Sequence, residues 1–417
     1  MLRTDVAVVG AGPAGLALTL MLLRSGVRVT LLEKSTSYRR DFHGEILQPG
    51  GQRVLDRLGV LHAARERGAR VLDGFRVLDR GRVLLDIDYR RLPAPYDHLL
   101  ALPQQHLLEQ LTEACGRLPG FRSLPGHRAD ALTHEHGRCS GVTATGPDGR
   151  RTTVRAPVVV GADGRFSRVR ALAGIDAGRT EAFDHDVVWI SLPAHGRGPG
   201  RVTVHRAAGT AVLVHDRHPD RLRIGWTLPH RARARAAVAA RGIDAVRTEL
   251  ADAVPEFADL IHDGLRTASQ LRLLDTFAAR APEWVRDGLV LLGDAAHTHG
   301  PLGAQGINLA LQDAAALHPV LVGALEHGDF SRARLLPFQR LRQPVSDAVT
   351  RMQRVQAKAF FGTGGRAADL ARAGAAGLVM RTPLGARVTA RVAEGRRPPP
   401  VRTDLFTRDT PLPAHPG

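Results

Sequence analysis

The sequence predicts an α/β fold: a parallel sheet with helices packed on it, a second β-rich sheet inserted into it, and helices at the C-terminal end. Three observations predict this fold. A short apolar strand followed directly by a glycine-rich turn occurs three times, at residues 6–15, 157–164 and 289–306. Between the second and third of these sites, residues 183–228 alternate apolar and polar side chains, as half-buried strands do. Residues 309–392 then carry long apolar and amphipathic segments that predict helices.

The first site has the residues of a dinucleotide-binding turn. An apolar run at residues 6–9 is followed by Gly10, Gly12 and Gly15, then by a helical segment and a second apolar run that ends on Glu33. Gly10 allows the tight turn, Gly12 lets the backbone approach a pyrophosphate, and Gly15 lets the helix pack closely on the strand. The helix N-terminus offers N–H groups and partial positive charge to phosphates. Glu33 follows Gly15 by 18 residues, close to the spacing of about 20 at which a carboxylate reaches ribose hydroxyls.

The same stretch has a competing interpretation, because residues 6–23 are almost free of polar side chains. Four of these 18 residues are glycine or proline, and they lie in the middle of the stretch. Asp5 precedes it, and no small-residue cleavage pattern follows before Glu33 and Lys34. A membrane span also needs about 20 continuous apolar residues. We therefore expect neither a signal peptide nor a membrane span.

Composition limits the class of protein further. The net charge is +17, but Lys34 and Lys358 are the only lysines, and the arginines are scattered along the whole chain. No basic block alternates with aromatic residues, so nucleic-acid binding is not expected, whereas a positive field could steer phosphorylated cofactors. The two cysteines, Cys115 and Cys139, form no disulfide framework and no metal-ligand spacing, which favours a reducing cytoplasm and predicts no metal site.

The remaining elements follow from periodicity and turn residues. Before the second glycine site we predict helices at 52–58 and 104–118, and strands at 71–78, 82–89, 129–134, 139–145 and 152–155. After it we predict helices at 167–173 and 231–253, and strands at 187–192, 202–205, 211–214, 222–226 and 269–275. Helices at 309–325, 331–354 and 367–392 precede a proline-rich, loop-rich tail at 396–417.

All three glycine sites should meet at the carboxyl edge of one parallel sheet, where α/β folds bind ligands. A nicotinamide dehydrogenase would need only the first site, so three sites suit a longer dinucleotide. The motifs Gly161-Ala162-Asp163-Gly164, Gly293-Asp294-Ala295-Ala296-His297 and Pro301 to Asn308 complete the pattern. Over about residues 3–345 the chain resembles the para-hydroxybenzoate-hydroxylase-like flavin monooxygenases, the group A aromatic hydroxylases.

This resemblance implies a Rossmann-type FAD-binding domain in three parts (1–70, 101–180 and 277–345). A β-sheet substrate domain (71–100 and 181–276) is inserted in it, and C-terminal helices with a tail follow (346–417). Gly10, Gly12 and Gly15 would hold the FAD pyrophosphate, and Glu33 would bind the adenosine ribose. Gln104 and Asp294 would bind the ribityl chain. The 301–308 turn would line the isoalloxazine, and the following helix would point its N-terminus at the flavin N1–O2 edge, where reduced flavin is anionic. The FAD contacts so implied are Gly10, Gly12, Pro13, Ala14, Gly15, Glu33, Lys34, His43, Gln104, Asp163, Gly164, Gly293, Asp294, Pro301, Gly303, Ala304, Gly306, Ile307 and Asn308. Many relatives carry arginine where this chain has His43, so the outer pyrophosphate contact could instead come from Arg39, Arg40 or Arg53.

The activity implied by the resemblance is hydroxylation of an aromatic, phenolic or quinone-like substrate, in natural-product or secondary metabolism. NADPH or NADH would reduce FAD, and O2 would give the flavin C4a-hydroperoxide that the electron-rich ring attacks. Such chemistry needs no nucleophile, triad or metal, and no catalytic residue is assigned. His299, His205 and Trp226 are weak candidates, with core packing as the alternative for the last two. We expect His297 to pack on the sheet and bond a backbone group, and Asp163 and Asp294 to bind ribose or backbone rather than act as acid or base.

Other functions stay open. A flavin halogenase shares the fold, but the Trp-x-Trp-x-Ile-Pro segment of that group is absent, since Trp189 and Trp226 stand alone. A flavin-dependent reductase or dehydrogenase and a non-catalytic flavoprotein are further alternatives. The few tyrosines and scattered apolar residues of the β-rich insert favour a roomy, mostly apolar pocket, and so a large aromatic or quinone-like precursor rather than a small benzoate. The chain is expected to be a monomer or a homodimer.

Overall fold

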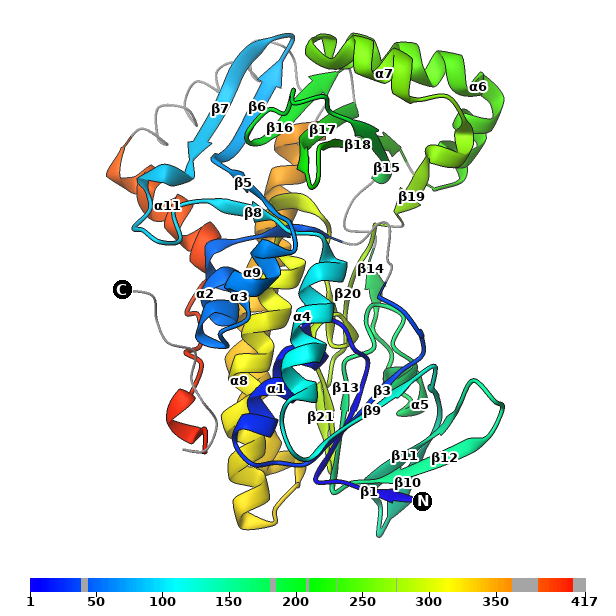
Figure 1. The fold of residues 1–417 in the computed structure, drawn as a ribbon, viewed down its shortest axis with the longest axis vertical. Coiled ribbons are helices and arrows are strands. Elements are labelled where there is room, and N and C mark those ends of the chain that lie inside the picture. The colour runs from blue at the N-terminus through cyan, green and yellow to red at the C-terminus, as the bar shows by residue number, and fades with distance from the viewer. Residues whose placement is uncertain are drawn as a thin grey trace.

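The computed structural model describes residues 1–38, 44–180, 185–207, 210–229, 231–274, 276–361 and 382–407, and Figure 1 shows their arrangement. A six-stranded core sheet has the order β21-β22-β13-β2-β3-β9 and is parallel except at β21. Every residue of β2, β3, β13 and β22 is buried, because both faces of the sheet are covered. Its strands are β2 (Val6–Val9), β3 (Val29–Glu33), β9 (Phe121–Pro125), β13 (Val158–Gly161), β21 (Val285–Arg286) and β22 (Leu289–Leu291).

Helices cover one face of this sheet and a second small sheet covers the other. On the helical face, α1 (Pro13–Arg24) packs against α4 (Gln104–Gly116) and α8 (Gly306–His327). The opposite face carries α5 (Arg168–Leu172) and a four-stranded sheet of order β1-β12-β11-β10. The strands of that sheet are β1 (Leu2–Arg3), β10 (Arg128–Glu135), β11 (Arg138–Thr145) and β12 (Arg151–Arg155). This layering confirms the predicted α/β fold class.

The β-rich insert forms a seven-stranded sheet of order β19-β15-β18-β17-β16-β6-β7. One of its faces is covered by α6 (Arg231–Ala253) and α7 (Ala258–Gly264), which bury apolar residues of β15, β17 and β18. The sheet lies beyond the carboxyl edge of the core sheet (Figure 1). Its strands are β6 (Gly74–Asp79), β7 (Arg82–Asp88), β15 (His185–Pro193), β16 (Val202–Ala207), β17 (Thr210–Arg217), β18 (Arg221–Pro229) and β19 (Arg272–Leu274).

Short strands and one long helix join the two sheets. The helix α9 (Arg332–Phe361) contacts β21 in the core sheet and β17 in the seven-stranded sheet. Near the C-terminus, α11 (Pro383–Glu394) packs on α2 (Pro49–Arg57). Two three-stranded sheets lie between, made of β4 (Ile46–Leu47), β8 (Leu99–Ala101) and β5 (Arg70–Leu72), and of β14 (Arg179–Thr180), β20 (Ala278–Arg280) and β23 (His297–Thr298). The 3-10 turns are Tyr89–Arg91, Pro255–Phe257, Ala268–Gln270, Gly293–Ala295, Leu302–Ala304 and Thr403–Leu405.

The observed boundaries differ from the predicted ones in a few places. The first helix begins at Pro13, since proline fits the first helical position, where no N–H is needed. The predicted strand at 269–275 begins as a 3-10 turn, because Thr267 and Gln270 form a capping box. The helix α3 (Leu61–Glu66) was not predicted. His43, Arg39, Arg40 and residues 367–381 of the predicted 367–392 helix lie outside the described residues. Within the described residues, no helix combines the length and the apolar character needed to cross a membrane.

Candidate functional site

The three glycine sites meet at the carboxyl edge of the core sheet. The backbone N–H of Ala162 donates to the carbonyl of Val9 at 2.7 Å, which joins the second site to the first. A Cβ added to Gly10 would lie 2.4 Å from the carbonyl oxygen of Ala162. A Cβ added to Gly293 would lie 3.3 Å from the Cβ of Ala14, so the third site touches the first helix. The convergence predicted from strand order is therefore present.

The glycines of the first turn have different surroundings. Gly10 has a φ of +109°, and a Cβ at Gly15 would lie only 2.0 Å from the carbonyl oxygen of Gly10. A Cβ at Gly12, in contrast, would meet nothing within 4 Å. Gly12 is also the N-cap of α1, and no side chain caps that helix. The first N–H groups of α1 therefore border an open space that suits a pyrophosphate.

Glu33 stands at the end of β3, beside that turn. Its carboxylate accepts hydrogen bonds from the N–H of Ala11 at 2.8 Å and of Ser35 at 3.0 Å. The side chain is buried, whereas the neighbouring Lys34 is exposed. The carboxylate thus joins the end of β3 to the glycine turn.

The two acidic residues of the second and third sites are placed differently. Asp163 accepts hydrogen bonds from the N–H groups of Arg168 at 2.6 Å and Val169 at 3.0 Å, and one from the hydroxyl of Ser167. Burial raises the pKa of Asp163, and these hydrogen bonds oppose that rise. The carboxylate of Asp163 therefore holds the backbone at the start of α5. Backbone binding was one of the two roles expected for it, the other being ribose binding. It also follows that the neighbouring Gly164, at a φ of +83°, sits in a turn held by this residue.

Asp294 is more open. Its side chain is one-third exposed, and Arg165 Nε lies 4.0 Å from its carboxylate. Desolvation raises the pKa of Asp294, and Arg165 opposes that rise. Gln104, the first residue of α4, is buried, and its Oε1 has no hydrogen-bond partner. An orphaned buried carbonyl is costly unless a ligand or water supplies a donor, so Gln104 suits a hydroxyl of a ribityl chain. The partly exposed carboxylate of Asp294 can accept a hydrogen bond from another such hydroxyl.

The segment 298–304 precedes α8, and we call it the flavin loop because the family resemblance implies that its turn lines the isoalloxazine. Gly303 has a φ of +74° and Ala304 one of +51°. The carbonyl of Gly303 accepts from Gln48 Nε2 at 2.8 Å and from Gln305 Nε2 at 3.1 Å. The helix α8 begins at Gly306 with no side-chain cap, so its N-terminus is available to an anionic group. Further along, Asn308 leaves its buried Oδ1 without a partner.

We expected a Cβ at Gly303 or Gly306 to intrude either on the isoalloxazine or on backbone. Among the described residues, backbone is not what a Cβ at Gly303 would meet, since the nearest protein atom would be Gln356 Oε1 at 3.8 Å. A Cβ at Gly306 would meet nothing within 4 Å. The constraint on Gly303 is therefore its positive φ and the open space beside it, not contact with the chain.

Residues that support the loop were missed in the sequence. Gln48 is fully buried and accepts a hydrogen bond from the hydroxyl of Tyr89 at 2.9 Å while it donates to Gly303. Gln353, on α9, donates to the carbonyls of Gly300 at 2.9 Å and Leu302 at 2.7 Å. A single glutamine, whether before a helix as Gln48 is or inside one as Gln353 is, carries no motif, so sequence alone offered no signal for them.

The face of the seven-stranded sheet that is not covered by α6 and α7 lies over the flavin loop. Ala304 packs with Phe75, Ile87 and Leu213 of that face in one apolar cluster. The strand register shows which residues of the neighbouring strands lie on the same face as Leu213. Across the sheet, Leu213 pairs with Gly225 and Val204, Gly225 with Trp189, and Val204 with Val77.

Two of the weak catalytic candidates point the other way. Trp226 pairs with Val212, which in turn pairs with His205, so all three lie on the face covered by α6 and α7. Trp226 is 1% exposed within that apolar cluster. His205 lies 3.4 Å from Glu256, and burial lowers its pKa. Neither side chain is brought to the flavin loop, in line with core packing.

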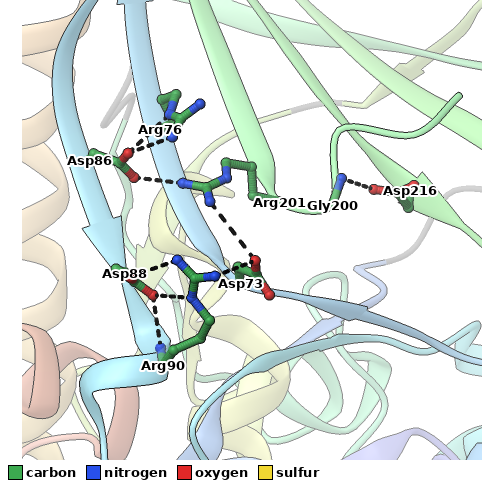
Figure 2. Close-up of polar contacts among 8 residues, drawn as sticks. All are labelled: Asp73, Arg76, Asp86, Asp88, Arg90, Gly200, Arg201 and Asp216. Carbon is green, nitrogen blue, oxygen red and sulfur yellow. Dashed lines mark hydrogen bonds and ion pairs between the residues drawn. The ribbon is translucent and has the colours of Figure 1, made fainter.

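A hollow of about 320 Å³ also lies on this helix-covered side, away from the loop. It is lined by Arg76, Leu78, Arg197, Gly198, Pro199, Arg201, Thr203, Glu256 and Phe257. Figure 2 shows that Arg76 and Arg201 both pair with Asp86, at 2.6 Å and 2.7 Å. Because these guanidinium groups already have carboxylate partners, the hollow is not an evident phosphate site.

A dinucleotide cradle at the edge of a parallel sheet, facing an apolar sheet across an uncapped helix N-terminus, is the arrangement expected for the flavin-dependent enzymes that the sequence resembles. A family model described as an FAD binding domain matches residues 3–353, and the chain belongs to this family. It is an FAD-dependent monooxygenase of the para-hydroxybenzoate-hydroxylase-like group, with NAD(P)H as co-substrate.

Relatives support the same assignment. The chain is 49% identical over 410 residues to a 6-methylpretetramide 4-monooxygenase from Streptomyces rimosus, covering 98% of this chain and 96% of that protein. It is 31% identical to a 12-dehydrotetracycline 5-monooxygenase/anhydrotetracycline 6-monooxygenase from S. rimosus subsp. rimosus, covering 85% of this chain and 70% of that one. The structure of Pseudomonas aeruginosa PqsL with 2-aminobenzoylacetate superposes with a TM-score of 0.78 at 26% identity, covering 88% of this chain and 99% of that one.

Proposed function

We propose that this monooxygenase hydroxylates a phenolic ring of a large, fused polycyclic aromatic substrate of the pretetramide class. The similarity to the 6-methylpretetramide 4-monooxygenase over nearly the whole of both chains carries this proposal. The apolar face over the flavin loop supports it, because Val77, Val204, Leu213 and Trp189 form a continuous row across five strands with Gly225. A row of that width suits a flat, extended apolar ligand better than a single ring.

Each part of the cradle then has a task in FAD binding. The backbone at Gly12 and the N–H groups of Ala14 and Gly15 bind the pyrophosphate, and Glu33 accepts hydrogen bonds from the adenosine ribose. Gln104 and Asp294 bind the ribityl chain, and the flavin loop with the start of α8 lies against the isoalloxazine. When bound, FAD supplies the oxygen-activating chemistry. The three segments 1–70, 101–180 and 277–345 form the FAD-binding domain, and 71–100 with 181–276 form the substrate domain.

Polar groups on the substrate face orient the ring. The guanidinium of Arg223 lies 4.9 Å from the ring centroid of Trp189, and His215 meets the same indole edge-on at 6.5 Å between centroids. Burial lowers the pKa of His215 to about 4, so its imidazole is neutral near pH 7. These residues replace His205 and Trp226 as the candidates nearest to substrate, and we assign them orientation rather than proton transfer.

The purified protein should be yellow, with about one FAD per chain released by acid or heat. Adding a polycyclic phenol of the pretetramide type should increase NAD(P)H consumption and give a product heavier by one oxygen atom in mass spectrometry. Small benzoates serve as the comparison and should stimulate poorly. Folded protein that takes up no FAD would refute the cofactor assignment, and equal turnover of small benzoates would refute the substrate class.

Replacing Glu33 with glutamine should weaken FAD binding by about tenfold to a hundredfold, because a hydrogen bond to a carboxylate contributes roughly 1.5–3 kcal/mol. The same change weakens the contacts to Ala11 and Ser35, so the melting temperature should also fall modestly. Fluorescence titration of the apoprotein with FAD measures the affinity. Glu66→Gln, at an exposed position, is the control. Unchanged affinity in Glu33→Gln would mean that the carboxylate serves the turn alone.

A further inference from the structure

A chain of buried polar side chains runs behind the flavin loop, and the proposed FAD contacts do not use it. Asp313 on α8 accepts a hydrogen bond from Arg342 Nε on α9 at 2.6 Å. The other carboxylate oxygen of Asp313 lies 2.6 Å from His297 Nε2. His297 Nδ1 lies 3.0 Å from His299 Nε2, and His299 Nδ1 lies 3.2 Å from the hydroxyl of Thr350 on α9. The expectation that His297 bonds a backbone group is therefore wrong, since its ring nitrogens face two side chains.

The protonation of these hydrogen-bonded side chains follows from the states of Asp313 and His299. Burial would raise the pKa of Asp313, but His297 and Arg342 outweigh it and hold that pKa below its usual range. The carboxylate can then only accept, so His297 carries a proton on Nε2. Burial lowers the pKa of His299 to about 3, which leaves its imidazole neutral with a single N–H. Nδ1 of His299 faces the hydroxyl of Thr350, whereas Nε2 faces His297 and, at 3.3 Å, the hydroxyl of Ser346 on α9, so the two edges of the ring are not equivalent.

These hydrogen-bonded side chains fasten the flavin loop to α9. Gly300, next to His299, donates its N–H to Gln353 Oε1 at 3.2 Å and accepts from Gln353 Nε2 at 2.9 Å. The strand β23 ends at Thr298, so residues 299–301 have no ladder bonds of their own. Since α9 also contacts β17 of the seven-stranded sheet, one helix sets the loop relative to the substrate face.

We propose that His299 is a positioning residue that holds the flavin loop on α9, through His297 and Asp313 on one side of its ring and Thr350 on the other. This inference rests on the proposed function, because it assumes that the loop lies against the isoalloxazine. Both ring nitrogens of His299 face these side chains, so the role assigned to it is positioning rather than contact with flavin or substrate. It sets the distance between them, and a displaced loop lets NAD(P)H be consumed without hydroxylation.

The positioning role can be tested with two substitutions that keep different ring nitrogens of His299. A glutamine amide can place its nitrogen near the position of His Nε2 and keep the bond to His297, whereas asparagine reaches only the position of Nδ1 and loses it. We expect His299→Gln to resemble the wild type. In His299→Asn, amide hydrogen exchange of the peptide 298–304 should be about tenfold faster in the holoenzyme and in the apoprotein, and product per NAD(P)H should fall.

His318→Asn is the matched control. His318 is a fully buried histidine on α8, and its Nε2 lies 2.8 Å from the hydroxyl of Ser25, far along the helix from the loop. The variant should melt earlier but keep the loop exchange and the coupling of the wild type. Thr350→Val, which removes only the hydroxyl beside His299 Nδ1, should loosen the loop less than His299→Asn and keeps the proposal testable if that variant does not fold.

The outcomes separate this inference from the proposed function. Wild-type loop exchange in both His299→Asn and Thr350→Val, or equal loosening in His318→Asn, would overturn the positioning role. Wild-type protein that binds no FAD would overturn the proposed function instead, while loop exchange in the apoprotein variants would still decide whether His299 holds the loop.

Discussion

Replacing Gly12 with alanine should yield a well-folded protein that does not retain FAD, whereas the same change at Gly15 should leave little folded protein. The two glycines are three residues apart in one turn, but their surroundings are opposite. A methyl group at Gly12 enters open space, while one at Gly15 would lie 2.0 Å from the carbonyl oxygen of Gly10. Because that oxygen belongs to the backbone of a buried turn, it cannot move aside as a flexible side chain could.

The expected magnitudes differ accordingly. In Gly15→Ala the free energy of unfolding should fall by about 3 kcal/mol or more, the upper range for overpacking a core. In Gly12→Ala it should change by no more than about 0.5 kcal/mol, while FAD affinity should fall by about 100-fold, because the methyl group occupies the path of the pyrophosphate. Thermal melting of the apoprotein and fluorescence titration with FAD measure the two effects. Normal FAD affinity in Gly12→Ala would place the pyrophosphate elsewhere.

Replacing Gly303 with valine should uncouple the enzyme, so that hydrogen peroxide per NAD(P)H rises and product per NAD(P)H falls severalfold. A β-branched residue at a φ of +74° costs about 1–3 kcal/mol of strain. The loop can relieve that strain only by moving away from Gln48 and Gln305, which hold the Gly303 carbonyl. A displaced loop puts the isoalloxazine out of line with the substrate, and small misplacements are costly in such reactions.

Gly328→Val is the matched control for this prediction. Gly328 ends the same helix, α8, with a φ of +63°, and a Cβ there would meet nothing within 4 Å. The strain should therefore be similar, but the site is at the far end of the helix from the flavin loop. We expect Gly328→Val to melt earlier and to couple normally. If Gly303→Val also melts early but couples normally, the glycine only turns the chain and the proposed flavin contact is wrong.

The sequence by itself determined the strand–turn–helix units and their order. Gly10, Gly12 and Gly15 stand where the local backbone conformation or a close approach requires glycine. Their spacing was therefore enough to predict a dinucleotide-binding turn at the N-terminus of α1. Three such units in parallel strands must meet at one edge of the sheet, and they do. The cofactor class followed from that convergence, because the constraints on each unit lie within a few residues of one another.

Only the tertiary structure decided how the flavin loop is held and which face of the seven-stranded sheet lies toward that loop. The contact between Gln48 and Gly303 joins residues 255 positions apart, and no local pattern marks either partner of such a bond. His205 and Trp226 could not be assigned to a face in advance, because the seven-stranded sheet has apolar residues on both sides. The register of β15 to β18 placed them under α6 and α7 and put Trp189 and Leu213 on the opposite face, where Leu213 packs in one apolar cluster with Ala304 of the loop. Packing between distant segments makes that choice, because a strand alternates its side chains identically whichever face is later covered by helices.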